Sequence, residues 1–274
     1  MERFLIPLDF TETSANALRY AFGLNKHYFA QLHALHVFDV PFSASLENDA
    51  GMIEYDRIRN SFTDKVWNFI ADNKGDYHYD TVVSATSGGD LQSIVNYVEE
   101  NDIHVVILGN KGKSGLGRWF FGTVTRNLLR HPPCMVLSVP TSYHWKEIRK
   151  ILVCTDLSMP LTPEQCTELK QFAEHTKAEL QFLHVQDKVE IALPEDSISV
   201  DTIRREFNVS PVTIPFRNSI AASVNDHIAA NGGELAVTLP HHHTWLDKLF
   251  LGSETAHMSD ELSVPLLSLK GMKK

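Results

Sequence analysis

The sequence lacks the features of a secreted, membrane-spanning or nucleic-acid-binding protein. Its 274 residues include only three cysteines (Cys134, Cys154 and Cys166), an odd and sparse count that indicates a reducing compartment and free thiols. No apolar run approaches the roughly 20 residues that a transmembrane helix needs, and the N-terminus has no signal-peptide pattern. With 25 basic against 34 acidic residues, the net charge of −9 leaves no electrostatic footprint for nucleic acid. We therefore expect a soluble, cytoplasmic protein without nucleic-acid or membrane partners.

The first half of the sequence alternates short apolar runs with amphipathic segments. The apolar runs predict strands at 3–8, 32–38, 77–85, 103–108 and 134–139. The segments between them predict helices at 11–26, 52–71, 91–100 and 123–130. Such βαβ alternation indicates a parallel sheet with right-handed crossovers and helices on both faces.

The second half repeats this pattern in a shorter form. The matched pairs are Lys150-Ile-Leu-Val-Cys-Thr-Asp156 with Arg3-Phe-Leu-Ile-Pro-Leu-Asp9, Leu183-His184-Val185 with Leu35-His36-Val37, Phe250-Leu-Gly252-Ser253 with Phe120-Phe-Gly122-Thr123, and Pro265-Leu-Leu-Ser-Leu with Cys134-Met-Val-Leu-Ser. Most of the shortening falls where helix 52–71 becomes a segment near 196–207. A repeat of this length is a duplicated domain. We expect domains at 1–140 and 149–272, joined by a linker at 140–148.

A glycine-rich stretch follows the fourth predicted strand, running Gly109-Asn-Lys-Gly112-Lys-Ser-Gly-Leu-Gly-Arg-Trp-Phe-Phe-Gly122-Thr123. A strand, a glycine loop and a helix start are the arrangement in which backbone N–H groups surround a phosphate. Ile107 stands where a Walker A loop needs glycine, and Phe120 where the dinucleotide fingerprint needs it. The remaining pattern, Gly-x2-Gly-x9-Gly-Thr, predicts a phosphate site, and the alternative is a plain flexible connection.

The predicted topology brings Asp9 and Gly109 together. Asp9 ends the first strand and Gly109 ends the fourth, and in a sheet of order 3-2-1-4-5 these strands are neighbours where the strand order reverses. Ligands of open parallel sheets bind there, outside the carboxyl ends of the strands. Val37, at the end of the second strand, borders the same crevice. This set suits a nucleotide, because backbone near Val37 can pair with a base, Asp9 can bond a ribose hydroxyl or a metal, and the glycine loop can hold phosphates.

With these residues the chain resembles the universal stress protein family in its tandem, two-domain form. The resemblance covers nearly the whole chain and rests on Pro7-Leu-Asp9, His36-Val37, the four-position glycine pattern and the matching elements of the second half. It implies two tandem Rossmann-like (adenine nucleotide alpha hydrolase-like) domains, each an α/β domain with a five-stranded parallel sheet of order 3-2-1-4-5 flanked by helices.

The resemblance also implies a ligand, ATP or another adenine nucleotide, in some members with Mg²⁺ or Mn²⁺. Asp9 would contact the ribose or a metal-bound phosphate, Val37 would offer its backbone to adenine, and Gly109 would lie near the ribose. The other residues of the predicted nucleotide site are Pro7, Leu8, Gly112, Lys113, Gly122, Thr123, Val124 and Thr125. Family members commonly dimerise through their last strand, so strands 134–139 and 265–269 could pair within one chain as an intrachain pseudo-dimer. A further homodimer stays open.

The second half departs from the glycine pattern. Leu239-Pro240-His241-His242-His243 stands where the first half has Gly109-Asn-Lys-Gly112-Lys, and Arg217-Asn218-Ser219 where it has Gly88-Gly89-Asp90. A Cβ blocks close backbone approach and Pro240 lacks a donor N–H, so we expect a degenerate copy and one nucleotide per chain. A metal at the three histidines is the lesser alternative to a solvated loop, because adjacent side chains do not readily converge on one ion.

The function predicted from these features is adenine-nucleotide binding with a regulatory role in the stress response. An enzyme is the second hypothesis, at most a slow ATPase or phosphoryl-transfer catalyst, since no base or arginine finger can be named and no residue is assigned as catalytic. A nucleotide-independent interaction scaffold is the third.

Asp9 has an alternative role as a cap for the following helix, and the recurrence of Asp156 favours a partly structural role. His36 and His184 are interpreted as packed strand residues, and Cys134 and Cys154 as inert core residues.

Overall fold

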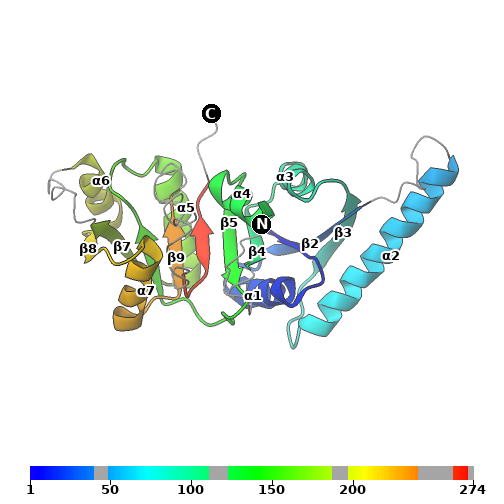
Figure 1. The fold of residues 1–274 in the computed structure, drawn as a ribbon, viewed down its shortest axis with the longest axis horizontal. Coiled ribbons are helices and arrows are strands. Elements are labelled where there is room, and N and C mark those ends of the chain that lie inside the picture. Colours follow the sequence, from blue (N-terminus) through cyan, green and yellow to red (C-terminus); the bar gives the residue numbers. More distant parts are fainter. Residues whose placement is uncertain (40–48, 111–122, 187–196, 240–261, 271–274) are drawn as a thin grey trace.

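The computed structural model describes residues 1–39, 49–110, 123–186, 197–239 and 262–270. In these residues the chain forms a ten-stranded sheet with helices on its faces (Figure 1). The strands are β1 (Arg3–Pro7), β2 (Gln31–Phe38), β3 (Thr81–Ser87), β4 (Val105–Asn110), β5 (Met135–Pro140), β6 (Lys150–Cys154), β7 (Glu179–Gln186), β8 (Val212–Pro215), β9 (Leu235–Thr238) and β10 (Leu266–Ser268). The helices are α1 (Glu12–Tyr28), α2 (Asp49–Asn73), α3 (Asp90–Glu100), α4 (Thr123–Arg130), α5 (Pro163–Thr176), α6 (Ile198–Phe207) and α7 (Ile220–Asn231).

The sheet has the order β3-β2-β1-β4-β5-β10-β9-β6-β7-β8. Each half therefore has the strand order 3-2-1-4-5, and the predicted Rossmann-like α/β fold is confirmed. All strand pairs are parallel except β5 with β10, which is antiparallel. The inner strands are continuous apolar runs, because a parallel strand covered by helices is buried on both faces. Phe4, Leu5 and Ile6 of β1 illustrate this, each with an exposed fraction of 0%.

Two strands of the first half differ from the prediction by more than one residue at each end, and one of them borders the site. The third strand, predicted at 77–85, is β3 at Thr81–Ser87, because Tyr77 and Tyr79 instead stack on Phe22 of α1 with ring centroids 5.7 and 6.1 Å away. The fourth strand, predicted at 103–108, continues to Asn110 as β4. Gly109 is thus a paired strand residue opposite Val139, one residue before the end of β4.

The two halves meet along β5 and β10. Leu137 lies opposite Leu267, and the Ser268 hydroxyl donates a hydrogen bond of 3.0 Å to the carbonyl of Leu129 in α4. Beside this seam the Tyr28 ring of α1 stacks on His175 of α5 with a centroid separation of 4.4 Å. The seam therefore joins the cores of the two halves into one buried cluster.

Residues 140–148, the predicted linker, pack against α1. The Asn16 side-chain amide donates to the carbonyls of Pro140 and Tyr143, both at 3.0 Å. A Cβ at Gly23 would come within 2.2 Å of the Trp145 ring, so only glycine allows the indole to lie against the helix. The segment after the first half is held in place on the helix that begins beside Asp9.

The three cysteines are predicted to be unreactive in the folded protein. All are free and buried. Burial raises the pKa of Cys134 to about 12 and that of Cys154 to about 12, and it also raises the pKa of Cys166. Only the thiolate attacks a disulfide reagent, so at pH 8 the native protein should release no chromophore from Ellman's reagent within minutes and three equivalents once unfolded. Rapid labelling of native Cys134 or Cys154 would contradict their placement in the core.

Candidate functional site

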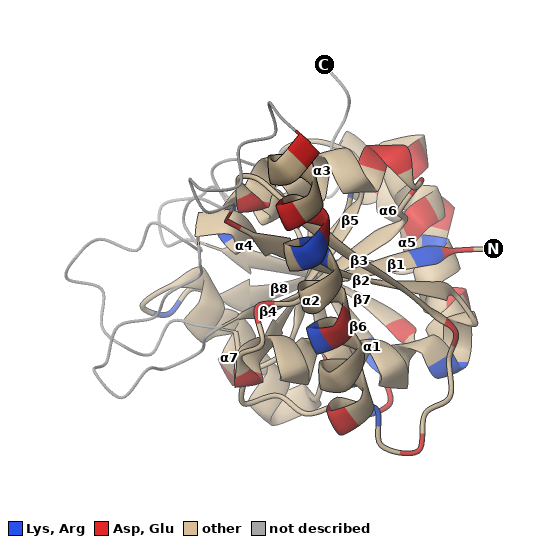
Figure 2. Cartoon of the chain, turned by 90° about the vertical axis from the view of Figure 1, so that its right-hand side faces the viewer, with Lys and Arg blue, Asp and Glu red and all other residues tan. Residues whose placement is uncertain are grey.

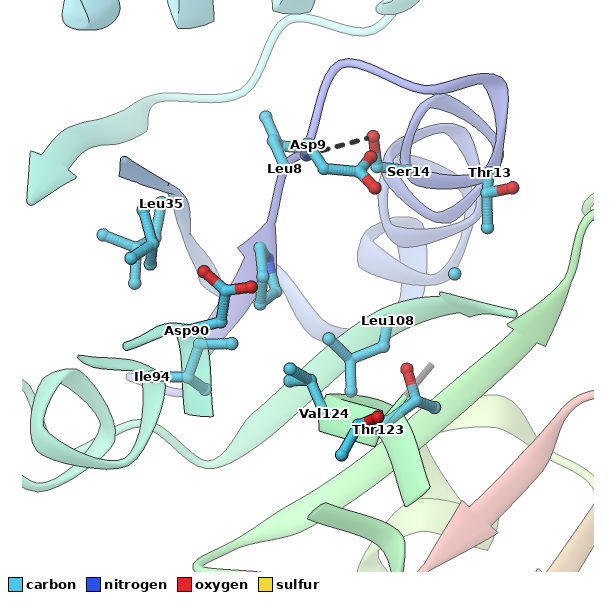
Figure 3. Close-up of a pocket in the computed structure, with 14 residues that line it drawn as sticks. Leu8, Asp9, Thr13, Ser14, Leu35, Asp90, Ile94, Leu108, Thr123 and Val124 are labelled. Carbon is cyan, nitrogen blue, oxygen red and sulfur yellow. Dashed lines mark hydrogen bonds between the residues drawn. The ribbon is translucent and has the colours of Figure 1, made fainter. Parts of the chain in front are cut away.

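A pocket of about 500 Å³ lies at the carboxyl ends of β1, β2 and β4 (Figure 3). The N-terminal ends of three helices line the pocket. Residues of the first turn of α1 and the first residues of α3 and α4 contribute to its wall. The lining residues are Pro7, Leu8, Asp9, Thr13, Ser14, Leu35, Val37, Asp90, Ile94, Leu108, Gly109, Thr123, Val124 and Thr125. The pocket thus stands where the strand order reverses, as the topology predicts.

The pocket brings together most of the residues predicted from the sequence. Those that line it are Pro7, Leu8, Asp9, Val37, Gly109, Thr123, Val124 and Thr125. Gly112, Lys113 and Gly122 lie outside the described residues, as do His241, His242 and His243. That the lining residues bind a nucleotide stays a prediction, but segments far apart in sequence do converge on one cavity.

Sequence reasoning missed several lining residues, above all Thr13, Ser14 and Asp90. Thr13 and Ser14 belong to the first turn of α1, and the Asp9 amide donates to the Ser14 hydroxyl at 3.4 Å (Figure 3). Asp90 is the first residue of α3. The signal available for all three is their position directly after the end of a strand, because helices that follow parallel strands begin at the ligand-binding edge of the sheet. Leu35, Ile94 and Leu108 are further apolar lining residues.

The turn between β1 and α1 is built around Asp9. One carboxylate oxygen, Oδ1, accepts from the Thr11 amide at 3.1 Å and from the Thr11 hydroxyl at 2.6 Å, and Phe10 has a left-handed φ of 61°. The second half repeats this turn: Asp156 Oδ1 accepts from the Ser158 amide at 3.0 Å, and Leu157 has φ 58°. The recurrence supports a structural role for this aspartate in both halves, beside any role of Asp9 toward a ligand.

The histidines of the two matched strands also play equivalent roles. His36 Nδ1 donates to the Leu8 carbonyl at 2.7 Å, and His184 Nδ1 lies 3.2 Å from the Thr155 carbonyl. Since a carbonyl only accepts, the proton lies on Nδ1 in each ring. Each ring therefore holds the end of the neighbouring strand just before its aspartate, which agrees with packed strand residues rather than catalysts.

Gly109 is glycine because β4 touches α1. A Cβ there would lie 2.4 Å from the Thr13 carbonyl oxygen and 2.6 Å from its Cγ2. The matching residue of the second half is Leu239, which is 2% exposed. Leu239 has room because α5 begins only at Pro163. Counted from the end of the preceding strand, α5 begins about one helical turn later than α1 does. The second half therefore lacks the helical turn that carries Thr13 and Ser14 in the first.

The charges around the pocket are unevenly distributed. Among the described lining residues the ionisable groups are the carboxylates of Asp9 and Asp90. The pocket wall also includes the start of α4 at Thr123, and the N–H groups of a first helical turn favour an anion. The described part of the chain contains no group of three or more His, Cys, Asp or Glu side chains that could hold a metal. The pocket thus offers both helix N–H donors and carboxylate acceptors.

The charged residues on one side of the described part of the chain are mixed in sign. On the side seen in Figure 2, Lys and Arg are interspersed with Asp and Glu, so the described residues there form no extended basic surface. None of the helices in the described part of the chain is long and apolar enough to span a membrane.

A parallel sheet with helices on its faces and a pocket outside the strand ends defines the Rossmann-like class of α/β proteins. Within this class, the profile of the universal stress protein family matches residues 1–140, and the chain belongs to that family. A universal stress protein of Methanocaldococcus jannaschii is 21% identical over 138 residues, covering 50% of this chain and 81% of that protein. The universal stress protein YxiE of Bacillus subtilis is 28% identical over 144 residues, covering 50% of this chain and 97% of that protein.

The whole chain also has a structural counterpart. The crystal structure of a universal stress protein from Archaeoglobus fulgidus superposes with a TM-score of 0.67 at 16% identity, covering 98% of each chain. At this identity the likeness shows a common fold across both halves.

Proposed function

We propose that the first half binds ATP or another adenine nucleotide in the pocket, and that the protein acts as a nucleotide-binding regulator in the stress response. The observation that carries the proposal is the convergence of Asp9, Val37, Gly109 and the start of α4 on one cavity. Family membership supports the stress-related role. Residues 1–140 would form the nucleotide-binding domain, and residues 149–272 a degenerate second domain.

The proposed ligand lies across the strand ends with its phosphates at the α4 end. Thr123, Val124 and Thr125 would hold the phosphates there, with Gly112, Lys113 and Gly122 of the preceding glycine stretch. The ribose would lie near Asp9 and Gly109, packed beside Pro7 and Leu8, and the base near the backbone of Val37. A Mg²⁺ or Mn²⁺ ion would enter with the phosphates and take Asp9 as its protein ligand, since the described residues offer no metal cage of their own.

Binding is favoured over turnover. Phosphoryl transfer needs a positioned base and cationic charge stabilisers, whereas the ionisable groups among the described lining residues are two carboxylates. We infer a cytoplasmic protein in which the pairing of β5 with β10 acts as an intrachain counterpart of a dimer contact. The buried, unpaired cysteines support the reducing location.

The repeat supplies a matched pair of variants for testing this function. Asp9 and Asp156 make the same turn, so Asp9→Ala and Asp156→Ala should each cost about 1 kcal/mol of unfolding free energy. Only Asp9→Ala should lower ATP affinity, by about tenfold for a lost charge-assisted hydrogen bond. Calorimetric titration of the wild-type chain with ATP, ADP and AMP should give one site per chain.

Two results would oppose the proposal. One is the absence of nucleotide binding to the native chain. The other is an equal loss of affinity in both aspartate variants, which would trace the effect to the stability of the turn rather than to the ligand.

A further inference from the structure

Asp90 lines the pocket where α3 begins. It is the first residue of α3, and Figure 3 shows its carboxylate turned toward the pocket beside Leu35 and Ile94, with Thr123 on the other side. The strand order explains this separation, because α3 follows the outer strand β3 whereas α4 follows β4. A nucleotide with its phosphates at α4 would therefore extend its base toward Val37 and Asp90.

The second half shows that the helix itself does not require an acid at this position. α3 has Gly89 as its N-cap, and α7 has Ser219, whose hydroxyl accepts from the Ala222 amide at 3.0 Å. When the two helices are aligned by their N-cap residues, Asp90 matches Ile220, which is buried with an exposed fraction of 6%. This corrects the sequence alignment by one residue, since Gly89 rather than Asp90 matches Ser219. An acid that only complemented the helix dipole would suit both helices equally.

Neither the backbone of Val37 nor the apolar side chains next to Asp90 distinguish adenine from a 6-oxo purine. The backbone of Val37 offers one donor and one acceptor, which can pair with the edge of adenine or of a 6-oxo purine. Leu35 and Ile94 are apolar and cannot distinguish an amino group from a carbonyl. An ionised carboxylate, in contrast, only accepts hydrogen bonds.

We propose that Asp90 makes the pocket selective for 6-amino purines over 6-oxo purines; this inference rests on the proposed nucleotide binding. The carboxylate accepts a hydrogen bond from the exocyclic amino group of adenine. In hypoxanthine or guanine that position is a carbonyl oxygen, so two acceptors would face each other. Beside apolar lining residues such a mismatch is poorly compensated by water, and polar mismatches of this kind discriminate more strongly than differences in size.

Competition binding with ATP, ITP and GTP tests this selectivity. The wild-type chain should bind ATP at least about tenfold more tightly than ITP, in which the 6-amino group is replaced by a carbonyl and N1 carries a proton. Asp90→Asn keeps the shape and adds an amide donor for the carbonyl, so the ATP-to-ITP ratio should fall toward one or invert. Glu100→Gln, at the other end of α3, is the matched control and should keep the wild-type ratio.

The outcomes separate this inference from the function on which it rests. If no nucleotide binds the wild-type chain, the proposed function fails. If ATP binds but Asp90→Asn keeps the wild-type ATP-to-ITP ratio, the proposed function stands and the role of Asp90 is wrong. If the wild-type chain prefers GTP to both ATP and ITP, the carboxylate reads the guanine amino edge and the inference is overturned.

Discussion

Gly109→Ser is expected to destabilise the chain and to weaken nucleotide binding together. A Cβ at this position would lie 2.4 Å from the carbonyl oxygen and 2.7 Å from the carbonyl carbon of Thr13. These are backbone atoms of α1, so no side-chain rotation relieves the overlap and the first turn of the helix must move. Overpacking of this kind costs about 1–3 kcal/mol of unfolding free energy.

The same displacement would reach the ligand site. Thr13 and Ser14 form part of the pocket wall, and the overlap would push this part of the wall away from β4. We expect nucleotide affinity to fall by about tenfold or more, since a displacement of about 1 Å in a binding site has effects of this order or larger. Thermal unfolding and calorimetric titration measure the two effects.

Gly89→Ser is the control for this prediction. No atom lies within 4 Å of a Cβ built at Gly89. Serine is a favoured N-cap residue, as Ser219 shows in the second half, so this substitution should hold or raise the melting temperature. A melting temperature for Gly109→Ser equal to that of the wild type would show that β4 and α1 are not in the contact described.

The sequence allowed the convergence of Asp9, Val37 and Gly109 to be predicted because it depends only on topology. Alternating strands and helices predict a parallel sheet, and its strand order places the ends of β1, β2 and β4 side by side. No contact between individual side chains is needed for that step. The helix at 123–130 could also be predicted, because an amphipathic segment follows the glycine-rich stretch, and α4 has these bounds.

Other parts of the site depend on contacts that a linear pattern does not contain. The role of Thr13 follows from how soon α1 begins after β1, and that distance becomes meaningful only against Gly109 on a distant strand. The position of Asp90 depends on which residue caps α3, and Gly89 has no side chain to signal a cap. Tyr77 and Tyr79 have a strand-like pattern, but they pack on Phe22 and delay the start of β3.

The difference between the two halves also has a physical account. Both keep the aspartate turn and the histidine that holds the preceding strand end, so these features serve the fold. The first half alone pairs a glycine in its fourth strand with an early helix start. In the second half, Leu239, directly after β9, occupies the position that matches Gly109, and α5 begins later. The loss of glycine and the loss of the helical turn are therefore one structural change.

Leu267→Ala is expected to lower the stability of both halves at once. Leu267 has an exposed fraction of 0% and lies in β10, between Leu137 of β5 and Val237 of β9. Truncating a buried leucine to alanine costs about 2–5 kcal/mol, which for a chain of this size lowers the melting temperature by on the order of 10 °C. Because β10 joins the two halves into one sheet, we expect a single cooperative transition in calorimetry before and after the substitution.

The control lies at the far edge of the same half. Val212 of β8 is 38% exposed, so Val212→Ala should cost about 1 kcal/mol or less. ATP at saturating concentration should raise the melting temperature of the single transition of the Leu267→Ala chain. A ligand that binds only the folded state stabilises the whole cooperative unit that contains its site. Two transitions, of which ATP moves only one, would show that the seam between β5 and β10 does not couple the pocket to the second half.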